Sequence, residues 1–377
     1  MITKSEDMIQ RGREFTEKYI KPIAKELDEN NRFPMELKDD MASEGFFGIH
    51  YPKEYGGLGL DAYTAYATNA ELAKGSAGIS LLFTVHWMAV DTIIKYGSDE
   101  IKEKYLRDLV TGKKIAAYSL SEFHAGSDAS AIKTTAEKVE EGWLLNGAKY
   151  FCTNGGIADI YVLTCKTDVE KGTNGISVFI LEKGQDGFNI GPYNNKMGCR
   201  SSATTSLFLN NCLIPQGNII GAENEGFKMS MYGLCGGRVG MSAMGIGIAE
   251  ATLDEAATYA NKRIAFGKPL SKLFSVQEMI SDSYVKLQAS KLLLKMVCGK
   301  IDSGENFAFE SSVAKLSAAD MVNTACHNAV QIFGGHGYMK DNNVERFARD
   351  GRLMDIGVGS SEVLKMVVGS TVLNMYK

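Results

Sequence analysis

The chain has 377 residues, and 41 Lys and Arg against 45 Asp and Glu give it a formal net charge of −4. This length predicts two or three domains, because one domain usually takes about 150 residues. The near balance of charge argues against a nucleic-acid-binding protein, which usually carries a basic face. The unusual feature is 40 glycines against 6 prolines. Such glycines serve close backbone approach to a bound cofactor, or merely loops and helix contacts.

The first third of the chain has a helical pattern. Phe15, Tyr19, Ile20 and Ile23 recur at three- and four-residue steps, as on one face of a helix. The segment 79–94 is so apolar that it predicts a buried helix. Further helices are predicted at residues 39–46 and 62–73, with a turn-rich segment at 51–59 between them.

From about residue 115 to 220 the hydrophobic period changes to two. Evenly spaced short strands of this kind indicate a small β-sandwich or β-barrel. The strands are predicted at residues 143–150, 160–164, 176–181 and 206–209, separated by turns rich in Gly, Asn and Asp.

The helical pattern returns from residue 226 to the end. Four amphipathic stretches with short links predict an antiparallel four-helix bundle, at residues 229–262, 276–302, 310–333 and 361–373. The predicted fold is therefore α+β and multidomain. It has an N-terminal α-helical domain (1–114), a middle β-barrel or β-sandwich domain (115–225) and a C-terminal four-helix bundle (226–377).

The sequence also argues against a membrane-spanning segment, a signal peptide, a disulfide framework and a metal site. No uninterrupted apolar run approaches the ~18 residues that a membrane-spanning helix needs. The N-terminus lacks the apolar core of a signal peptide, so we expect a cytoplasmic protein with no membrane partner. The seven cysteines include no CxxC pair and the five histidines no HxxxH or HExxH spacing, so neither a disulfide framework nor a metal site is predicted.

Four segments carry residue types that suit a bound cofactor. In the segment 118–128, the hydroxyls of Ser121 and Ser127 lie near small residues and suit hydrogen-bond donation to a ring or a phosphate. Each segment is also compatible with an ordinary turn or helix end. The other three are 151–155, with an aromatic and a hydroxyl at a strand end, 263–267, whose arginine suits phosphate, and 331–338, whose glycines expose the backbone.

In this order, the segments resemble the acyl-CoA dehydrogenase family, in its short-chain, butyryl-CoA dehydrogenase-like branch, over essentially the whole chain. The resemblance implies the three-domain fold, one FAD per subunit and a homotetramer. It also implies an acyl-CoA or carrier-protein thioester as substrate, with electron-transferring flavoprotein as a candidate electron partner. The matching motifs are YGGLG at 55–59, AGSD at 125–128, TNGG at 153–156, GFK at 226–228, RIAFG at 263–267, QIFGGHGY at 331–338 and RD at 349–350.

Carried over position by position, the resemblance assigns FAD contacts to the β-domain and the bundle, partly across a subunit interface. Ser121 would bond the isoalloxazine edge, and residues 151–153 would cover the other side of the ring. Phe274 stands where the family usually has Gln, so one flavin hydrogen bond is expected to be missing. The predicted FAD-contacting residues are Tyr118, Leu120, Ser121, Ser127, Phe151, Cys152, Thr153, Arg263, Phe266, Phe274, Gln331, Gly334, Gly335, Ser360 and Glu362.

The proton acceptor of the family is the feature that this sequence lacks. It is normally a Glu in a segment that here reads DIGVGSSE, at residues 355–362. Val358 occupies the Glu position and Gly357 that of the preceding Tyr. Relatives that carry the Glu on the first bundle helix would have it at Gly237. Valine cannot take a proton, so both base positions are lost.

The thioester-binding half of the site is expected to remain, because the backbone N–H of Val358 would still bond the thioester oxygen. Candidates for a replacement base are Asp355, His124 and Tyr232, each of which is equally compatible with a solvated or structural role. The predicted substrate-contacting residues are Ser127, Cys235, Arg238, Val358 and Gly359.

The sequence thus predicts an FAD-dependent oxidoreductase that acts on an acyl thioester with non-standard proton chemistry. A dehydrogenase with a relocated base is one form of this hypothesis. The alternatives are a desulfinase-like elimination from an acyl-CoA, which needs no α-proton base, and a catalytically silent flavin- or acyl-CoA-binding homologue.

Overall fold

A computed structural model describes residues 3–377. Its N-terminal third is a stack of helices around α5 (Ala77–Tyr96), which is buried along nearly its whole length. The prediction of a buried helix here is confirmed. By length and hydropathy α5 could cross a membrane, but 83% of its most apolar window is buried inside the protein, as in a core helix. The other helices of this part are α1 (Lys4–Phe15), α2 (Ala24–Asn30), α3 (Lys38–Ser43), α4 (Ala62–Gly75) and α6 (Asp99–Val110).

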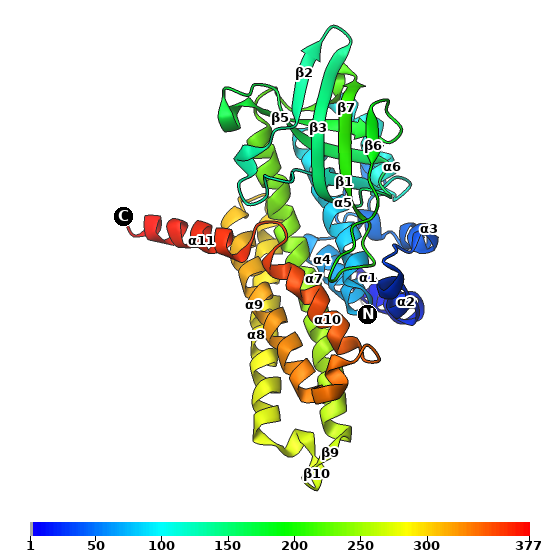
Figure 1. The fold of residues 1–377 in the computed structure, drawn as a ribbon, viewed down its shortest axis with the longest axis vertical. Coiled ribbons are helices and arrows are strands. Elements are labelled where there is room, and N and C mark those ends of the chain that lie inside the picture. Colours follow the sequence, from blue (N-terminus) through cyan, green and yellow to red (C-terminus); the bar gives the residue numbers. More distant parts are fainter. Residues whose placement is uncertain (1–2) are drawn as a thin grey trace.

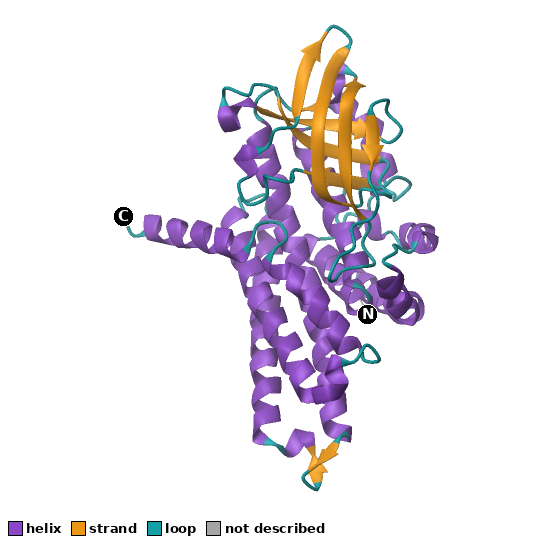
Figure 2. Cartoon of the chain, in the orientation of Figure 1, coloured by secondary structure: helices purple, strands orange, loops and turns teal. Residues whose placement is uncertain are grey.

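The middle of the chain forms an eight-stranded sheet at one end of the molecule (Figure 2). Its order is β6-β7-β3-β2-β4-β5-β8, with β1 paired to β4 in parallel. The long antiparallel pair β3–β7 carries an irregularity between Lys149 and Cys152, and this break turns Phe151 outward. The strands are β1 (Ala116–Ser119), β2 (Thr135–Val139), β3 (Gly142–Thr153), β4 (Ile160–Lys166), β5 (Ile176–Glu182), β6 (Phe188–Ile190), β7 (Thr204–Ile214) and β8 (Ile219–Ile220).

The C-terminal part is a helical bundle. Its long helices are α7 (Gly226–Lys262), α8 (Phe274–Asp302) and α9 (Ala308–Phe333), and a small hairpin of β9 (Ile264–Ala265) and β10 (Lys268–Pro269) joins the first two.

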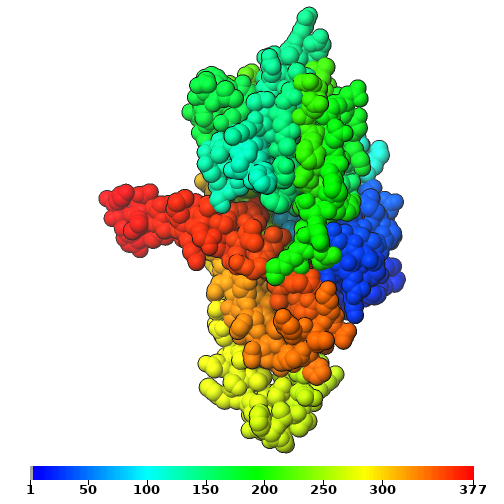
Figure 3. Space-filling model, viewed as in Figure 1, coloured from blue at the N-terminus to red at the C-terminus, as the bar shows by residue number. Residues whose placement is uncertain are grey.

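The prediction that the segment 361–373 is the fourth bundle helix is wrong. The segment forms α11 (Ser361–Met375), but this helix projects from the body as an arm (Figures 1 and 3) and buries only Ser361 and Leu364. The fourth position belongs to α10 (Asn343–Gly351), which packs against α7 and α9. Its apolar residues Val344, Phe347 and Ala348 recur at three- and four-residue steps, but over little more than two turns, which is short for a bundle helix.

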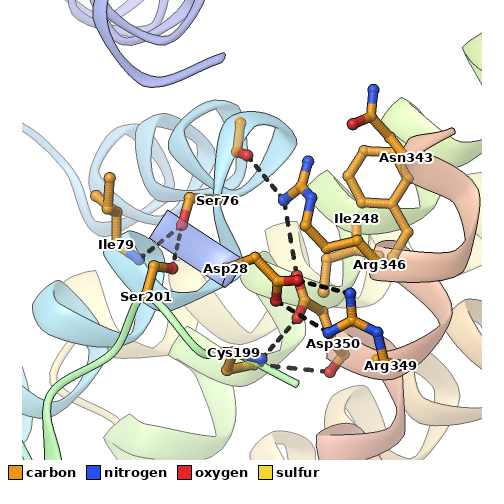
Figure 4. Close-up of polar contacts among 12 residues, drawn as sticks. Asp28, Ser76, Ile79, Cys199, Ser201, Ile248, Asn343, Arg346, Arg349 and Asp350 are labelled. Carbon is orange, nitrogen blue, oxygen red and sulfur yellow. Dashed lines mark hydrogen bonds and ion pairs between the residues drawn. The ribbon is translucent and has the colours of Figure 1, made fainter. Parts of the chain in front are cut away.

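A charged network, partly buried, ties α10 to the other two parts of the chain (Figure 4). Arg349 pairs with Asp28 of α2 at 2.7 Å and with Glu345 at 2.7 Å. The neighbouring Asp350 accepts a hydrogen bond from the backbone N–H of Cys199, in the connection between β6 and β7, at 2.6 Å. These contacts fix the bundle against both the N-terminal helices and the sheet.

Candidate functional site

The predicted substrate site lies where α5, α7 and the loop before α11 meet, and glycines allow the close approach. A Cβ built at Gly237 would lie 2.6 Å from Met88 Sδ and 2.7 Å from Val358 Cγ1. One turn further along α7, a Cβ at Gly240 would lie 2.6 Å from Thr84 Cγ2. Gly237 and Val358, far apart in the chain, are therefore neighbours in the fold.

The loop at this point holds an uncommon backbone conformation. Val358 and Gly359 both have positive φ, at 54° and 99°. A β-branched residue with positive φ is a genuine outlier, and such a conformation costs on the order of 1–3 kcal/mol unless the surroundings impose it. Two cations do so, because Arg238 Nε donates to Val358 O at 3.3 Å and Lys315 Nζ donates to Gly359 O at 2.7 Å.

Both cations are buried and lack a carboxylate partner. Arg238 is 9% exposed and Lys315 is 0% exposed. Burial lowers the pKa of Arg238, and burial lowers the pKa of Lys315 to about 8. Within residues 3–377, no carboxylate lies within 4.0 Å of either group. Arg238 instead donates to Ser312 Oγ at 3.2 Å. The site is therefore rich in positive charge, which favours negative charge on a bound ligand.

Asp355, one predicted replacement base, is held as a brace of the loop. Its Oδ1 accepts from Ser361 Oγ at 2.7 Å, and its Oδ2 accepts from Asn323 Nδ2 at 2.7 Å and from Arg352. These bonds hold the carboxylate toward α9 and α11. Both of its oxygens already accept hydrogen bonds from the protein.

The other two predicted bases lie apart from each other, and only Tyr232, one turn before Gly236 on α7, is near Asp91. His124 is in the β-domain, 3.6 Å from Glu122 Oε2, with 41% of its side chain exposed. Tyr232 lies near the start of α7 with its ring against Tyr96, and Lys95 Nζ sits 4.1 Å from the ring centre. Burial raises the pKa of Tyr232, which makes the phenol a poor acid at neutral pH. The structure does not bring the three candidates together.

Asp91 of α5 was not among the predicted bases, but its carboxylate lies against α7 next to the predicted substrate site. Its Oδ2 would lie 3.3 Å from a Cβ built at Gly236, next to Gly237. Its Oδ1 accepts from the Tyr51 hydroxyl at 2.9 Å, and His50 Nε2 lies 3.8 Å from the same oxygen. Oδ2 accepts no hydrogen bond from any described residue, and the side chain is 21% exposed. The sequence signal was an acidic residue inside an apolar helix.

Aromatic rings surround this carboxylate. Trp87 packs edge-on against both His50 and Tyr66, with centroids at 5.2 and 5.5 Å. Burial and then the charge of Asp91 raise the pKa of Tyr51 and of Tyr66, so both phenols stay protonated. An apolar setting of this kind strengthens the electrostatic effect of the single carboxylate.

The residues predicted to line the flavin ring lie at the ends of β1 and β3, beside α7. Tyr118 donates its hydroxyl to Ser230 O at 3.3 Å, and a Cβ at Gly233 would lie 2.8 Å from the same hydroxyl. Phe151 is 68% exposed, which suits an aromatic that covers a planar ligand. Cys152 is 1% exposed and burial raises its pKa to about 12, so only its backbone is open to a ligand.

The remaining loop residues that are predicted to contact the flavin also differ in how exposed they are. Ser121 and Thr153 are half-buried and Ser127 is exposed, so their hydroxyls can donate to a ligand, whereas Leu120 is buried. A Cβ built at Gly126 would meet nothing within 4 Å, and its bare backbone is therefore open. Exposed hydroxyls, open backbone and an outward aromatic fit the polar edge and flat face of an isoalloxazine ring.

A second group of predicted FAD residues lies at the opposite end of the bundle. Arg263 and Phe266 follow the end of α7, about 30 residues beyond Gly233, which is about 45 Å of helix. Tyr259 stacks on Phe333 with centroids 4.1 Å apart, which brings the segment 331–335 to the same end. Phe266 and Phe274 are 89% and 78% exposed. One copy of the chain cannot bring both groups to a single dinucleotide.

Ser360 and Glu362 lie at the start of α11, beside the loop that carries Val358. The Ser360 hydroxyl accepts from the backbone N–H of Val363 at 3.4 Å and so caps the helix. Cys235 packs against Arg238, whose Nη1 lies 3.8 Å from its Sγ, and burial raises the pKa of its thiol. The predicted thioester residues on α7 and on the loop are thus in contact.

Comparison with known proteins identifies the family. The family models of the acyl-CoA dehydrogenase N-terminal, middle and C-terminal domains match residues 3–113, 117–212 and 224–373. The chain belongs to the acyl-CoA dehydrogenase family. It is 39% identical to the short-chain-specific acyl-CoA dehydrogenase of Clostridium acetobutylicum, over 98% of both chains. It is 40% identical to the 3-(aryl)acrylate reductase of Clostridium sporogenes, over 99% of both chains.

Solved structures agree with this assignment. Butyryl-CoA dehydrogenase from Megasphaera elsdenii superposes with a TM-score of 0.96, at 37% identity and 99% coverage of both chains. An FAD complex of PigA superposes with a TM-score of 0.92, at 29% identity, covering 99% of this chain and 98% of that one. The predicted three-part fold is confirmed, and FAD is the cofactor of this protein.

Proposed function

We propose that this family member oxidises or reduces an acyl thioester and that Asp91 is its proton-transfer group. The observation that carries the proposal is the open Oδ2 of Asp91 against Gly236, which is the neighbour of Gly237 in α7. Val358 and Gly237 fill the two positions at which the family resemblance places a glutamate, and neither can take a proton.

The surroundings of Asp91 suit a proton acceptor. The Tyr51 hydroxyl fixes one carboxylate oxygen and leaves the other oxygen open, so the acceptor atom is oriented in advance. Bound FAD supplies hydride transfer to or from the acyl chain. The chain itself supplies the proton path at Asp91 Oδ2 and, at the other end of the thioester, the Val358 N–H near two buried cations.

The position of Asp91 also bears on which acyl carbon loses or gains the proton. Met88 and Val358 occupy the space beside Gly237, where a glutamate would act on the carbon next to the carbonyl. Asp91 acts from α5 instead, one helical turn beyond Met88. We therefore expect the acyl chain to turn the carbon that exchanges its proton toward α5.

The holoenzyme is proposed to be a homotetramer, with electron-transferring flavoprotein as its electron partner. The two groups of FAD residues, about 45 Å apart along α7, support a cofactor site completed by another copy. The apolar side chains that α11 exposes, Met366, Leu373 and Tyr376, supply a surface for such contacts. Light scattering of the purified holoenzyme tests the oligomeric state.

The test of the proposed reaction uses the anaerobic holoenzyme and a panel of saturated and unsaturated acyl-CoA thioesters. We expect at least one thioester to bleach or shift the flavin spectrum. When the enzyme is incubated with that thioester in D₂O, we expect deuterium to enter the acyl chain at one carbon. This uptake should require Asp91. A spectrum unmoved by every thioester refutes the oxidoreductase assignment. Deuterium uptake that persists in Asp91→Asn refutes the role of Asp91.

A further inference from the structure

Lys315 is a buried cation that takes no direct part in the proposed proton transfer. It lies on α9 and is 0% exposed, and within residues 3–377 its Nζ donates a single hydrogen bond, to Gly359 O at 2.7 Å. An ammonium group has three N–H donors and is rarely buried without a carboxylate. Fold stability alone would favour an apolar side chain at such a place.

The acceptor of this bond is the unusual part of the site loop. Gly359 follows Val358, and both residues have positive φ. Arg238 holds the Val358 carbonyl from α7, while Lys315 holds the next carbonyl from α9. Two donors on two different helices therefore impose a conformation that valine by itself disfavours.

We infer that Lys315 is a positioning residue, whose ammonium group holds the Val358–Gly359 backbone so that the Val358 N–H is aimed at the thioester oxygen. This inference rests on the proposed thioester site. The charged groups that face Lys315 are Arg238 of α7, which repels its charge, and Asp355 of the loop and Glu362 of α11, which attract it. Loss of the charge would weaken the clamp and the positive potential together.

The experiment uses the oxidised holoenzyme with crotonyl-CoA labelled with ¹³C at the carbonyl. Hydrogen bonds to the thioester oxygen lower the carbonyl stretching frequency, which difference infrared spectroscopy measures. We expect a clear downshift in the wild-type protein and less than half of it in Lys315→Met. The matched control is Lys286→Met, because Lys286 also joins α9 to a neighbouring helix, through Thr324 at 2.9 Å, away from the loop.

The outcomes separate this inference from the function on which it rests. A wild-type protein in which neither crotonyl-CoA nor any other thioester of the panel moves the flavin spectrum or the carbonyl band refutes the thioester site itself. A wild-type downshift that persists in Lys315→Met, or that falls equally in Lys286→Met, overturns the positioning role. If Lys315→Met does not fold, the wild-type downshift is followed from pH 6.5 to 9.5. A decrease centred near pH 8 supports the role, and a constant value overturns it.

Discussion

Replacing Lys315 by Met is expected to stabilise the fold while it damages the site. Burial lowers the pKa of Lys315 from 10.5 to about 8, and this difference corresponds to about 3 kcal/mol of destabilisation while the group is charged. The variant removes that cost but leaves Gly359 O without its donor, at about 1 kcal/mol. At pH 7 the net gain in the free energy of unfolding is about 2 kcal/mol.

The pH dependence identifies the cause. Between about pH 8 and 10.5 the unfolded chain holds a proton on Lys315 that the folded protein has lost, so the wild-type stability rises with pH in this window. From pH 8 to 9.5 the wild-type protein should gain about 2 kcal/mol relative to the variant. Urea unfolding of both proteins at several pH values measures the difference. A variant that is less stable than wild type at pH 7, or a difference that does not change with pH, would show that the buried charge of Lys315 does not destabilise the fold.

Three further variants test other parts of the account. Gly237→Ala should lower the free energy of unfolding by about 1–3 kcal/mol in urea, because its Cβ would overlap Met88 and Val358. The control Gly299→Ala, also in a helix, should not destabilise the protein, because its Cβ meets nothing within 4 Å. Equal effects of the two variants would contradict the close packing at Gly237. Arg263→Ala should lower the flavin content of the purified protein, measured by absorbance. Retention of full flavin would rule out a cofactor contact at Arg263, which lies about 45 Å from Tyr118 along α7. Val358→Glu restores a carboxylate beside Gly237, so this variant should dehydrogenate butyryl-CoA in an anaerobic dye-reduction assay. A variant that binds flavin but is inactive would show that the acyl site has changed in other ways.

The sequence predicts the large elements well because they depend on local pattern. The alternating apolar residues of β4 and β5 and the long helical period of α7 are visible without any tertiary contact. The assignment fails at α10 and α11, where a short helix is packed and a longer one projects. The sequence does show that the apolar residues of α10 share one face while those of α11 do not, but which helix completes the bundle also depends on the surface that faces it.

The site was predictable only in part, for the same reason. The loss of the glutamate at Val358 can be seen from one segment, but its contact with Gly237 joins two segments that are distant in the chain. Asp91 was passed over because a single acidic residue barely changes the strongly apolar pattern of α5. Lys315 was missed because an isolated lysine in a helix normally faces water, and only the fold shows that it faces Gly359.

The role of Asp91 in proton transfer can be measured by the rate at which a responding acyl-CoA bleaches the flavin, followed anaerobically by stopped flow. General acid–base groups contribute about 10²–10⁴-fold to rate, so Asp91→Asn should slow bleaching by at least about 100-fold with its flavin content unchanged. Asp355→Asn loosens the loop but leaves the proposed proton acceptor in place, so it should slow bleaching far less than Asp91→Asn does. Bleaching by Asp91→Asn at the wild-type rate, or its loss only in Asp355→Asn, would contradict the account.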